Sequence, residues 1–159
     1  MSEDFVKIYL QPHEGILVKI CRAYAYSQEE FEDLYQEVCL QLWRSRDKFE
    51  GRSKWSTFVY RVALNVCLSL TRSRKTRTDL EAAPLPTAEN EAFANEEVRL
   101  LYGAIRRLPE ADRALILLYL EEKSYKEMAE ILGTNPSHIG VKINRIKKRL
   151  KKQLDGTLN

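Results

Sequence analysis

Glycine, proline, cysteine and histidine are all scarce in this chain of 159 residues. Six Gly and five Pro exclude collagen-like and low-complexity proteins. The longest apolar run, 114–120, is far shorter than the roughly 18–20 residues that a membrane span needs. The chain opens on polar and acidic residues, which gives no sign of a secretion signal. These absences predict a cytoplasmic protein without membrane insertion.

The cysteines Cys21, Cys39 and Cys67 are widely spaced and form no C-x-x-C pair. Their odd number and apolar surroundings disfavour a disulfide framework or a zinc site, and indicate buried thiols that act as small hydrophobes. The two histidines, His13 and His138, are too distant in sequence to suggest a ligand cluster. Because no nucleophile–base pair and no phosphate-binding glycine loop is evident, we expect no metal, no cofactor and no enzymatic activity.

Charge is present in blocks, although the net charge is only +3. Residues 27–37 hold five acids and no base, whereas residues 44–77 hold ten bases against two acids. The stretch 78–100 is acidic again, and residues 131–154 hold seven bases and no acid. Two basic blocks separated by an acidic connector suggest two contacts with a nucleic acid. The alternative is a helical protein whose Lys-rich faces are merely solvated.

Hydrophobic spacing of three and four residues recurs almost throughout and predicts an all-α fold. The expected helices cover 16–26, 29–47, 56–73, 100–108, 110–120, 124–132 and 136–154. The pattern fails around the Pro-containing stretch 82–87, which is typical of a linker. We therefore predict two small helical domains, 1–76 and 97–159, joined by a flexible linker over 77–96.

The second domain has the sequence form of a helix-turn-helix. Ser124 and Glu127 fit a capping box, Gly133 fits a helix end, and Asn135 with Pro136 fits the start of the next helix. The first helix is expected to pack through Tyr125, Met128, Ala129 and Leu132. The second would bury Ile139, Ile143, Ile146 and Leu150 and direct Ser137, His138, Lys142 and Arg145 toward a major groove. Phosphates would be reached by Arg145, Lys147, Lys148, Arg149, Lys151 and Lys152. An ordinary helical hairpin with a soluble tail is the alternative.

The stretch 49–77 interleaves aromatic and basic side chains. Trp55, Phe58 and Tyr60 alternate with Arg52, Lys54 and Arg61, which suits stacking of unpaired bases beside their phosphates. The predicted helix 56–73 would bury Val59, Val62, Ala63, Val66 and Leu70 and expose Arg61, Asn65 and Arg72 on its opposite face. Aromatics at this spacing are also common in protein cores.

A third feature is the acidic face formed by Asp33, Gln36 and Glu37, which repeat at spacings of three and four. Such a face cannot bind nucleic acid, so it is either a solvated surface or a protein contact.

The order of these features resembles the extracytoplasmic-function (ECF) sigma factors, the smallest bacterial sigma factors. DLYQEVCLQLWRSRDKFEG (33–51) is similar to the family's D-L-x-Q-E-x-F…W…F-x-G signature, and STFVYRVALNVCLSLTRSRK (56–75) to its T-W-L-Y-R-I-A-x-N stretch. LPEADRALILLYLEEKSYKEMAEILG and VKINRIKKRLKK resemble its second DNA-binding domain. Gly140 departs from the pattern, since the family often has Arg or Lys there.

The resemblance implies a role for each feature. Asp33, Gln36 and Glu37 match the helix that binds core RNA polymerase. The downstream promoter element, with a flipped base, would be held as a single strand by Arg52, Lys54, Trp55, Arg61, Asn65 and Arg72. The upstream element would be read as duplex by Ser137, His138, Lys142, Arg145, Lys148 and Arg149. The resemblance also implies an anti-sigma factor as a partner.

The sequence leaves two other functions open. A helix-turn-helix regulator acting as a dimer would bind duplex DNA without polymerase. A protein-interaction adaptor would have basic faces with negligible DNA affinity.

Overall fold

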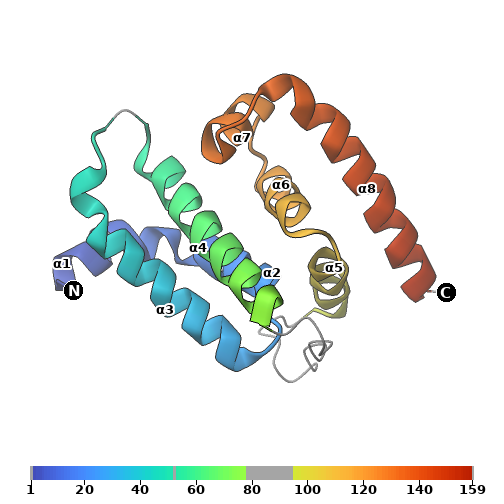
Figure 1. Ribbon diagram of the computed structural model, residues 1–159, viewed down its shortest axis with the longest axis horizontal. Coiled ribbons are helices and arrows are strands. Elements are labelled where there is room, and N and C mark those ends of the chain that lie inside the picture. The colour runs from blue at the N-terminus through green and yellow to red at the C-terminus, as the bar shows by residue number, and fades with distance from the viewer. Residues whose placement is uncertain (1, 52, 78–94, 159) are drawn as a thin grey trace. The chain divides into compact units, whose positions relative to one another are not determined.

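The computed structural model describes residues 2–51, 53–77 and 95–158, and side chains up to residue 73 and from 95 to 156 within these ranges. All regular elements among these residues are helical, so the expected all-α class is confirmed. The chain divides into two compact units, 1–85 and 86–159 (Figure 1). The predicted linker lies mostly outside the described residues.

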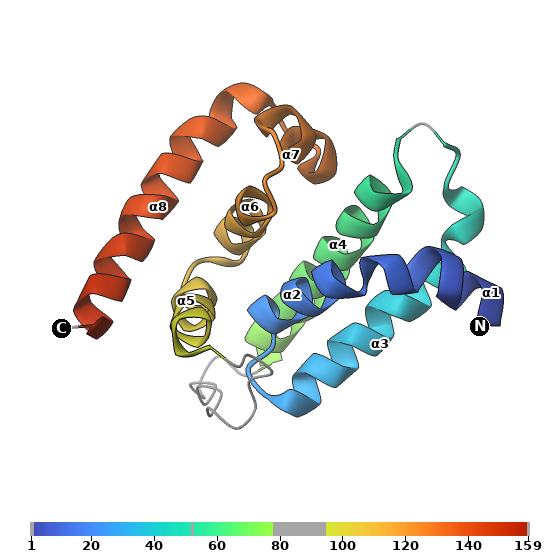
Figure 2. The ribbon, with the colours of Figure 1, turned by 180° about the vertical axis from the view of Figure 1, so that it is seen from behind.

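The first unit contains three long helices preceded by short turns. Helix α1 (Glu3–Phe5) continues as a π-helical turn, η1 (Val6–Leu10), and a 3-10 turn, η2 (Gln11–His13). Helices α2 (Glu14–Tyr24) and α3 (Gln28–Arg44) follow, and the 3-10 turn η3 (Arg46–Lys48) precedes α4 (Trp55–Arg77). Helices α2, α3 and α4 pack against one another, as Figure 2 shows from behind.

The core of this unit lies among these three helices. Leu17 and Ile20 of α2, Val38 and Leu42 of α3, and Val59 of α4 have no exposed surface. Each aliphatic side chain of this size contributes about 1.5–3 kcal/mol when it is fully buried. The apolar residues that recur at spacings of three and four therefore form the buried face of α2 and most of that of α3. Phe31 is an exception, since it is half-buried beneath the guanidinium of Arg22, whose Cζ lies 3.9 Å from the ring centroid.

The predicted buried face of α4 is partly wrong. Val59 and Ala63 are buried as expected, but Val62 and Val66 are half-buried and Leu70 is 41% exposed. Tyr60, Leu64, Cys67 and Thr71 are buried in their place. The reason is that α4 contacts both α2 and α3, so two neighbours cover a stripe that is rotated from the most apolar one.

The second unit is built on its last helix. Helices α5 (Glu96–Arg106), α6 (Glu110–Leu120) and α7 (Tyr125–Leu132) all contact α8 (Pro136–Leu158). Ile139, Ile143, Ile146 and Leu150 of α8 are buried, and this confirms the predicted stripe.

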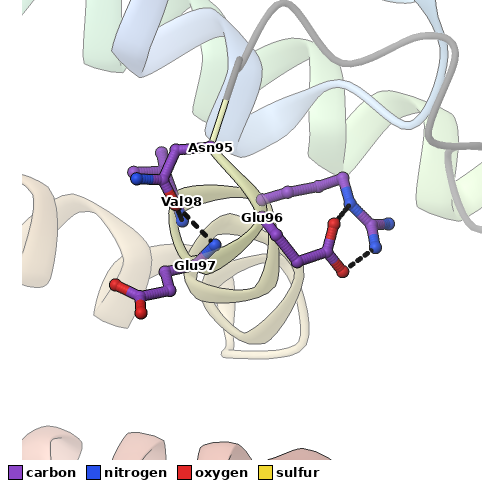
Figure 3. A network of polar contacts seen from close by, with 5 residues as sticks. Asn95, Glu96, Glu97 and Val98 are labelled. Atoms are coloured by element: carbon purple, nitrogen blue, oxygen red, sulfur yellow. Dashed lines mark hydrogen bonds and ion pairs between the residues drawn. The ribbon is translucent and has the colours of Figure 1, made fainter.

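Helix α5 begins four residues earlier than the apolar pattern predicts. The Asn95 side chain accepts hydrogen bonds from the backbone N–H groups of Glu97 (2.7 Å) and Val98 (3.4 Å), and so caps the helix (Figure 3). The Arg99 guanidinium pairs with the Glu96 carboxylate on the first turn and lowers its pKa. Cap and ion pair extend the helix over a polar turn that periodicity alone does not reveal.

The helix-turn-helix follows the predicted local chemistry. Ser124 and Glu127 form the reciprocal capping box, each at 3.1 Å. Gly133 ends α7 in the left-handed region, with φ of 67°. Asn135 Oδ1 then accepts a hydrogen bond from the Ser137 backbone N–H at 3.0 Å, ahead of α8.

The expected packing of α7 needs one correction. Met128 and Ala129 are buried as predicted, but Ile131 is buried in place of Leu132, and Tyr125 is 42% exposed. The Tyr125 ring lies beside Gly140, where a Cβ would meet its Cε2 at 3.2 Å. The absent side chain at Gly140 therefore makes room for this ring on α8.

Candidate nucleic-acid and protein interfaces

The face of α8 opposite its buried stripe is basic. The predicted contact residues are all exposed on it: Ser137, His138, Lys142, Arg145, Lys148 and Arg149. The buried Ile stripe fixes this orientation, since the opposite side of a helix must then face water. The positive side of the helix is thus available to a polyanion.

Two basic side chains of α8 have partners on α6. Lys147 Nζ donates a hydrogen bond to the Tyr119 hydroxyl at 3.1 Å and lies 5.0 Å from the centre of that ring. This bond raises the pKa of Lys147. Lys147 is therefore directed toward α6, unlike the phosphate contact that the sequence suggested. Arg145 lies 3.9 Å from an Asp112 carboxylate oxygen, while its own side chain stays 67% exposed.

An apolar residue stands out on the basic face. Val141 is 72% exposed, the most exposed of the large hydrophobic side chains in the part of the chain described. Sequence reasoning did not select it, although an apolar residue between Gly140 and Lys142, off the Ile stripe, was visible in the pattern. The methyl groups of such a side chain suit contact with a thymine methyl in a major groove.

A second polar face lies on α4. Arg61, Asn65 and Arg72 are exposed at spacings of four and seven residues, and Lys54 is exposed just before the helix. The structure therefore places Arg61, Asn65 and Arg72 together on one side of α4. Arg52, the remaining predicted cation, lies outside the described residues.

Trp55 packs within an aromatic cluster and is not an isolated surface side chain. Its ring centroid lies 5.2 Å from that of Phe49, 5.1 Å from that of Phe58 and 5.2 Å from that of Tyr9. Its indole N–H donates a hydrogen bond to the Tyr9 carbonyl at 2.9 Å. Tyr60 is buried, with 6% of its surface exposed. Tyr60 is therefore a core residue and not a base platform, and Trp55 is half-buried and fixed in place.

The acidic face on α3 adjoins a groove. Asp33 and Gln36 are exposed, while Glu37 is half-buried. Glu37 lines a groove of about 340 Å³ together with Asn65 and Leu70 on α4, and its other lining residues are Gln41, Val62, Val66 and Ser69. The groove is therefore lined both by Glu37, which is predicted to bind polymerase, and by Asn65, which is predicted to bind DNA. The sequence did not reveal that these two residues lie so close together.

The cysteines lie in the first unit, Cys21 and Cys67 buried and Cys39 half-buried. A hydrogen bond with Cys21 and burial raise the pKa of Cys67, and burial raises the pKa of Cys39 to about 11. Thiols in this state are poor metal ligands and nucleophiles at neutral pH. Within residues 2–51, 53–77 and 95–158 no cluster of three or more His, Cys, Asp or Glu could hold a metal ion.

The described helices include none with the length and apolarity needed to cross a bilayer.

Comparison with known proteins identifies both units. Residues 10–77 match Sigma-70 region 2, and residues 99–150 match Sigma-70 region 4. The ECF RNA polymerase sigma factor SigW of Bacillus subtilis is 27% identical over 95% of this chain and 87% of its own length. RNA polymerase sigma factor SigZ of the same organism is 30% identical over 81% of this chain and 75% of its own length.

A solved structure shares the fold. The sigma factor RpoE from Bartonella quintana, crystallised with the anti-sigma factor NepR, has a TM-score of 0.80 and 20% sequence identity, and the match covers 97% of this chain and 98% of that one. Two sigma-70 regions in one chain do not favour a helix-turn-helix regulator that acts without polymerase. The chain belongs to the ECF sigma factors, which direct bacterial RNA polymerase to promoters.

Proposed function

We propose that this sigma factor holds promoter DNA at two sites of different chemistry. The upstream element would bind as duplex to the basic face of α8, with Ser137, His138, Lys142 and Arg145 near base edges and Lys148 and Arg149 at phosphates. The observation that supports this most directly is the exposure of these six side chains opposite a fully buried stripe.

The downstream element would bind as a single strand to the first unit. Lys54, Arg61 and Arg72 supply charge for the phosphates, and Asn65 supplies an amide for a base edge. Arg52 belongs to the same proposed set. Trp55 would form the wall behind the strand, since its N–H is already used by the Tyr9 carbonyl. A site that holds unpaired bases favours the melted promoter.

Core polymerase would bind the acidic face of α3 through Asp33, Gln36 and Glu37. Carboxylates repel the DNA backbone, so an exposed acidic face beside a DNA-binding face suits a protein partner. The groove lined by Glu37 and Leu70 adds apolar surface to that contact.

An anti-sigma factor is the other partner that we propose. RpoE of Bartonella quintana was solved in complex with the anti-sigma factor NepR, and this chain shares its fold. A protein that covered the α3 face would exclude polymerase by competition. We further propose that the protein acts in the cytoplasm, where polymerase is found, and that it has no catalytic activity or cofactor of its own.

The domain limits that we propose are 1–76 for the polymerase-binding and downstream-element domain and 97–159 for the helix-turn-helix domain. The stretch 77–96 would connect them.

Transcription in a purified system tests the proposed function. Core polymerase is incubated with a library of genomic fragments, with or without this chain, and transcript starts are mapped. The chain should enable initiation at a small set of sites that share two spaced elements. If initiation is the same with and without the chain on every fragment, the proposed function is wrong. A variant with Arg61→Ala and Asn65→Ala should still bind polymerase but open these promoters poorly.

A further inference from the structure

The residues before α2 contribute two of the six rings of an aromatic cluster in the first unit. Its rings come from the N-terminal residues 5–9, from the end of α3 and the loop that follows it, and from the first turn of α4. The members of this cluster are Phe5, Tyr9, Trp43, Phe49, Trp55 and Phe58. Only part of the cluster falls within the match to Sigma-70 region 2, which begins at residue 10.

Phe5 is the buried anchor of the N-terminal segment. Only 6% of its surface is exposed. Its ring meets Trp43 edge to face with centroids 5.1 Å apart, Trp55 edge to face at 6.2 Å, and Tyr9 in a stacked arrangement at 5.4 Å. Phe5 thus connects the end of α3 with the start of α4.

Tyr9 fixes Trp55 by a second kind of contact. The Trp55 indole N–H donates to the Tyr9 backbone carbonyl at 2.9 Å, although the two residues are 46 positions apart. The rings also meet edge to face at 5.2 Å. Tyr9 lies in the π-helical turn η1, a distortion of helical geometry that is frequent where backbone serves a function.

On the other side, Trp55 packs on Phe58 and Phe49. The Phe49–Phe58 centroid distance is 5.5 Å, so the three rings form one group. Lys54 lies next to Trp55 in the sequence, and Arg61 lies one helical turn beyond Phe58. Whatever fixes Trp55 therefore also fixes the start of the face proposed to hold single-stranded DNA.

We infer that the segment Phe5–Tyr9 is a positioning element for that DNA-binding face. It holds Trp55 directly, and Phe49 through Trp55, in one arrangement before DNA arrives, so the strand does not have to order them on binding. This inference rests on the proposed function of the first unit and adds to it a set of residues that touch no DNA.

The test measures holoenzyme binding to a forked DNA. The probe carries a fluorophore and the single-stranded non-template strand of the downstream element of a promoter found by the transcription experiment above. Phe5→Ala should weaken binding about fivefold, the range expected when ordered side chains must be immobilised on binding. Phe5→Tyr, which keeps the ring, should bind like the wild type. Ile8→Ala is the matched control, since Ile8 lies in the same segment and is 61% exposed.

Salt dependence separates positioning from direct contact. Phe5 has no charge, so Phe5→Ala should leave the slope of log affinity against log salt unchanged. Arg61→Ala should reduce that slope by about 0.7, the value for one phosphate contact on a single strand. Affinity for core polymerase and for upstream duplex should be unchanged in Phe5→Ala.

The outcomes distinguish the inference from the proposed function. If Arg61→Ala weakens forked-DNA binding and Phe5→Ala does not, the positioning role is wrong and the proposed site stands. If neither variant changes binding, both are wrong. An equal loss of forked-DNA, duplex and polymerase binding in Phe5→Ala would indicate a purely structural role and overturn the inference. Should Phe5→Ala fail to fold, Trp55→Phe removes the bond to Tyr9 while keeping an aromatic ring, and it should weaken forked-DNA binding about twofold.

Discussion

Neighbouring lysines on α8 allow a direct test of how this helix meets duplex DNA. Lys147 and Lys148 have the same charge and the same flexible side chain. Lys147 donates to the Tyr119 hydroxyl at 3.1 Å, whereas Lys148 is exposed on the proposed DNA face. We predict that Lys148→Ala removes one phosphate contact and that Lys147→Ala removes none.

The size of the effect follows from counterion release. One phosphate contact on duplex DNA contributes about 0.9 to the slope of log affinity against log salt. Between 50 and 200 mM salt, a fourfold change, that slope corresponds to a roughly 3.5-fold change in affinity. The ratio of the wild-type DNA affinity to that of Lys148→Ala should therefore fall by about 3.5-fold as salt rises from 50 to 200 mM. The Lys147→Ala curve should run parallel to that of the wild type.

Fluorescence anisotropy of a labelled upstream-element duplex, titrated with the complete chain at several salt concentrations, gives the slopes. Tyr119→Phe is the control, because it removes the acceptor of Lys147 and leaves both charges in place. Parallel lines for Lys148→Ala and the wild type, or an equal loss of slope in both lysine variants, would refute the orientation assigned to α8.

Three further predictions concern other surfaces. Val141→Ala should lose about fourfold in affinity for duplexes with a thymine in the upstream element, since about one methyl-sized contact is lost. Replacing that thymine by uracil should cause the same loss in the wild type and none in the variant; equal behaviour of thymine and uracil probes in the wild type would exclude the contact. Asp33→Arg with Glu37→Arg should weaken core polymerase binding at least tenfold, because two charges are reversed, with unchanged circular dichroism; unchanged affinity would remove the acidic face from the interface. Burial raises the pKa of Cys39 to about 11, so at pH 8 its thiolate fraction is about a hundredfold below that of a free thiol. In the native protein Cys39 should therefore react correspondingly slowly with a disulfide reagent, and the reaction should become fast when urea unfolds the protein. Rapid labelling of Cys39 in folded protein would contradict its burial.

The second unit was the more predictable from sequence, and its construction explains this. The capping box at Ser124, the left-handed Gly133 and the cap at Asn135 are contacts within three or four residues. Such contacts depend on local sequence, so the pattern contains them. The Ile stripe of α8 meets α5, α6 and α7 on one side only, and the simple helical period therefore identified the buried face.

The first unit was less predictable because long-range contacts decide its surfaces. Helix α4 is covered by both α2 and α3, and this buries Tyr60 and exposes Leu70 against the apolar pattern. The hydrogen bond between Trp55 and Tyr9 spans 46 residues and has no sequence signature. Spacing could therefore place Arg61 and Asn65 on one face, but it could not show which aromatic rings support them.

Gly140 shows how packing can explain a departure from a family pattern. A basic side chain is frequent at this position of the recognition helix, yet a Cβ here would meet the Tyr125 ring at 3.2 Å. Tyr125 begins α7 and is held by the capping box at Ser124, so its backbone has little freedom to move. The ring and the missing side chain are therefore complementary, and a side chain at 140 would require the Tyr125 ring to shift by a few tenths of an ångström. Without that cation, we expect base discrimination by α8 to depend on the other residues proposed near base edges, which are Ser137, His138, Lys142 and Arg145, together with the exposed Val141.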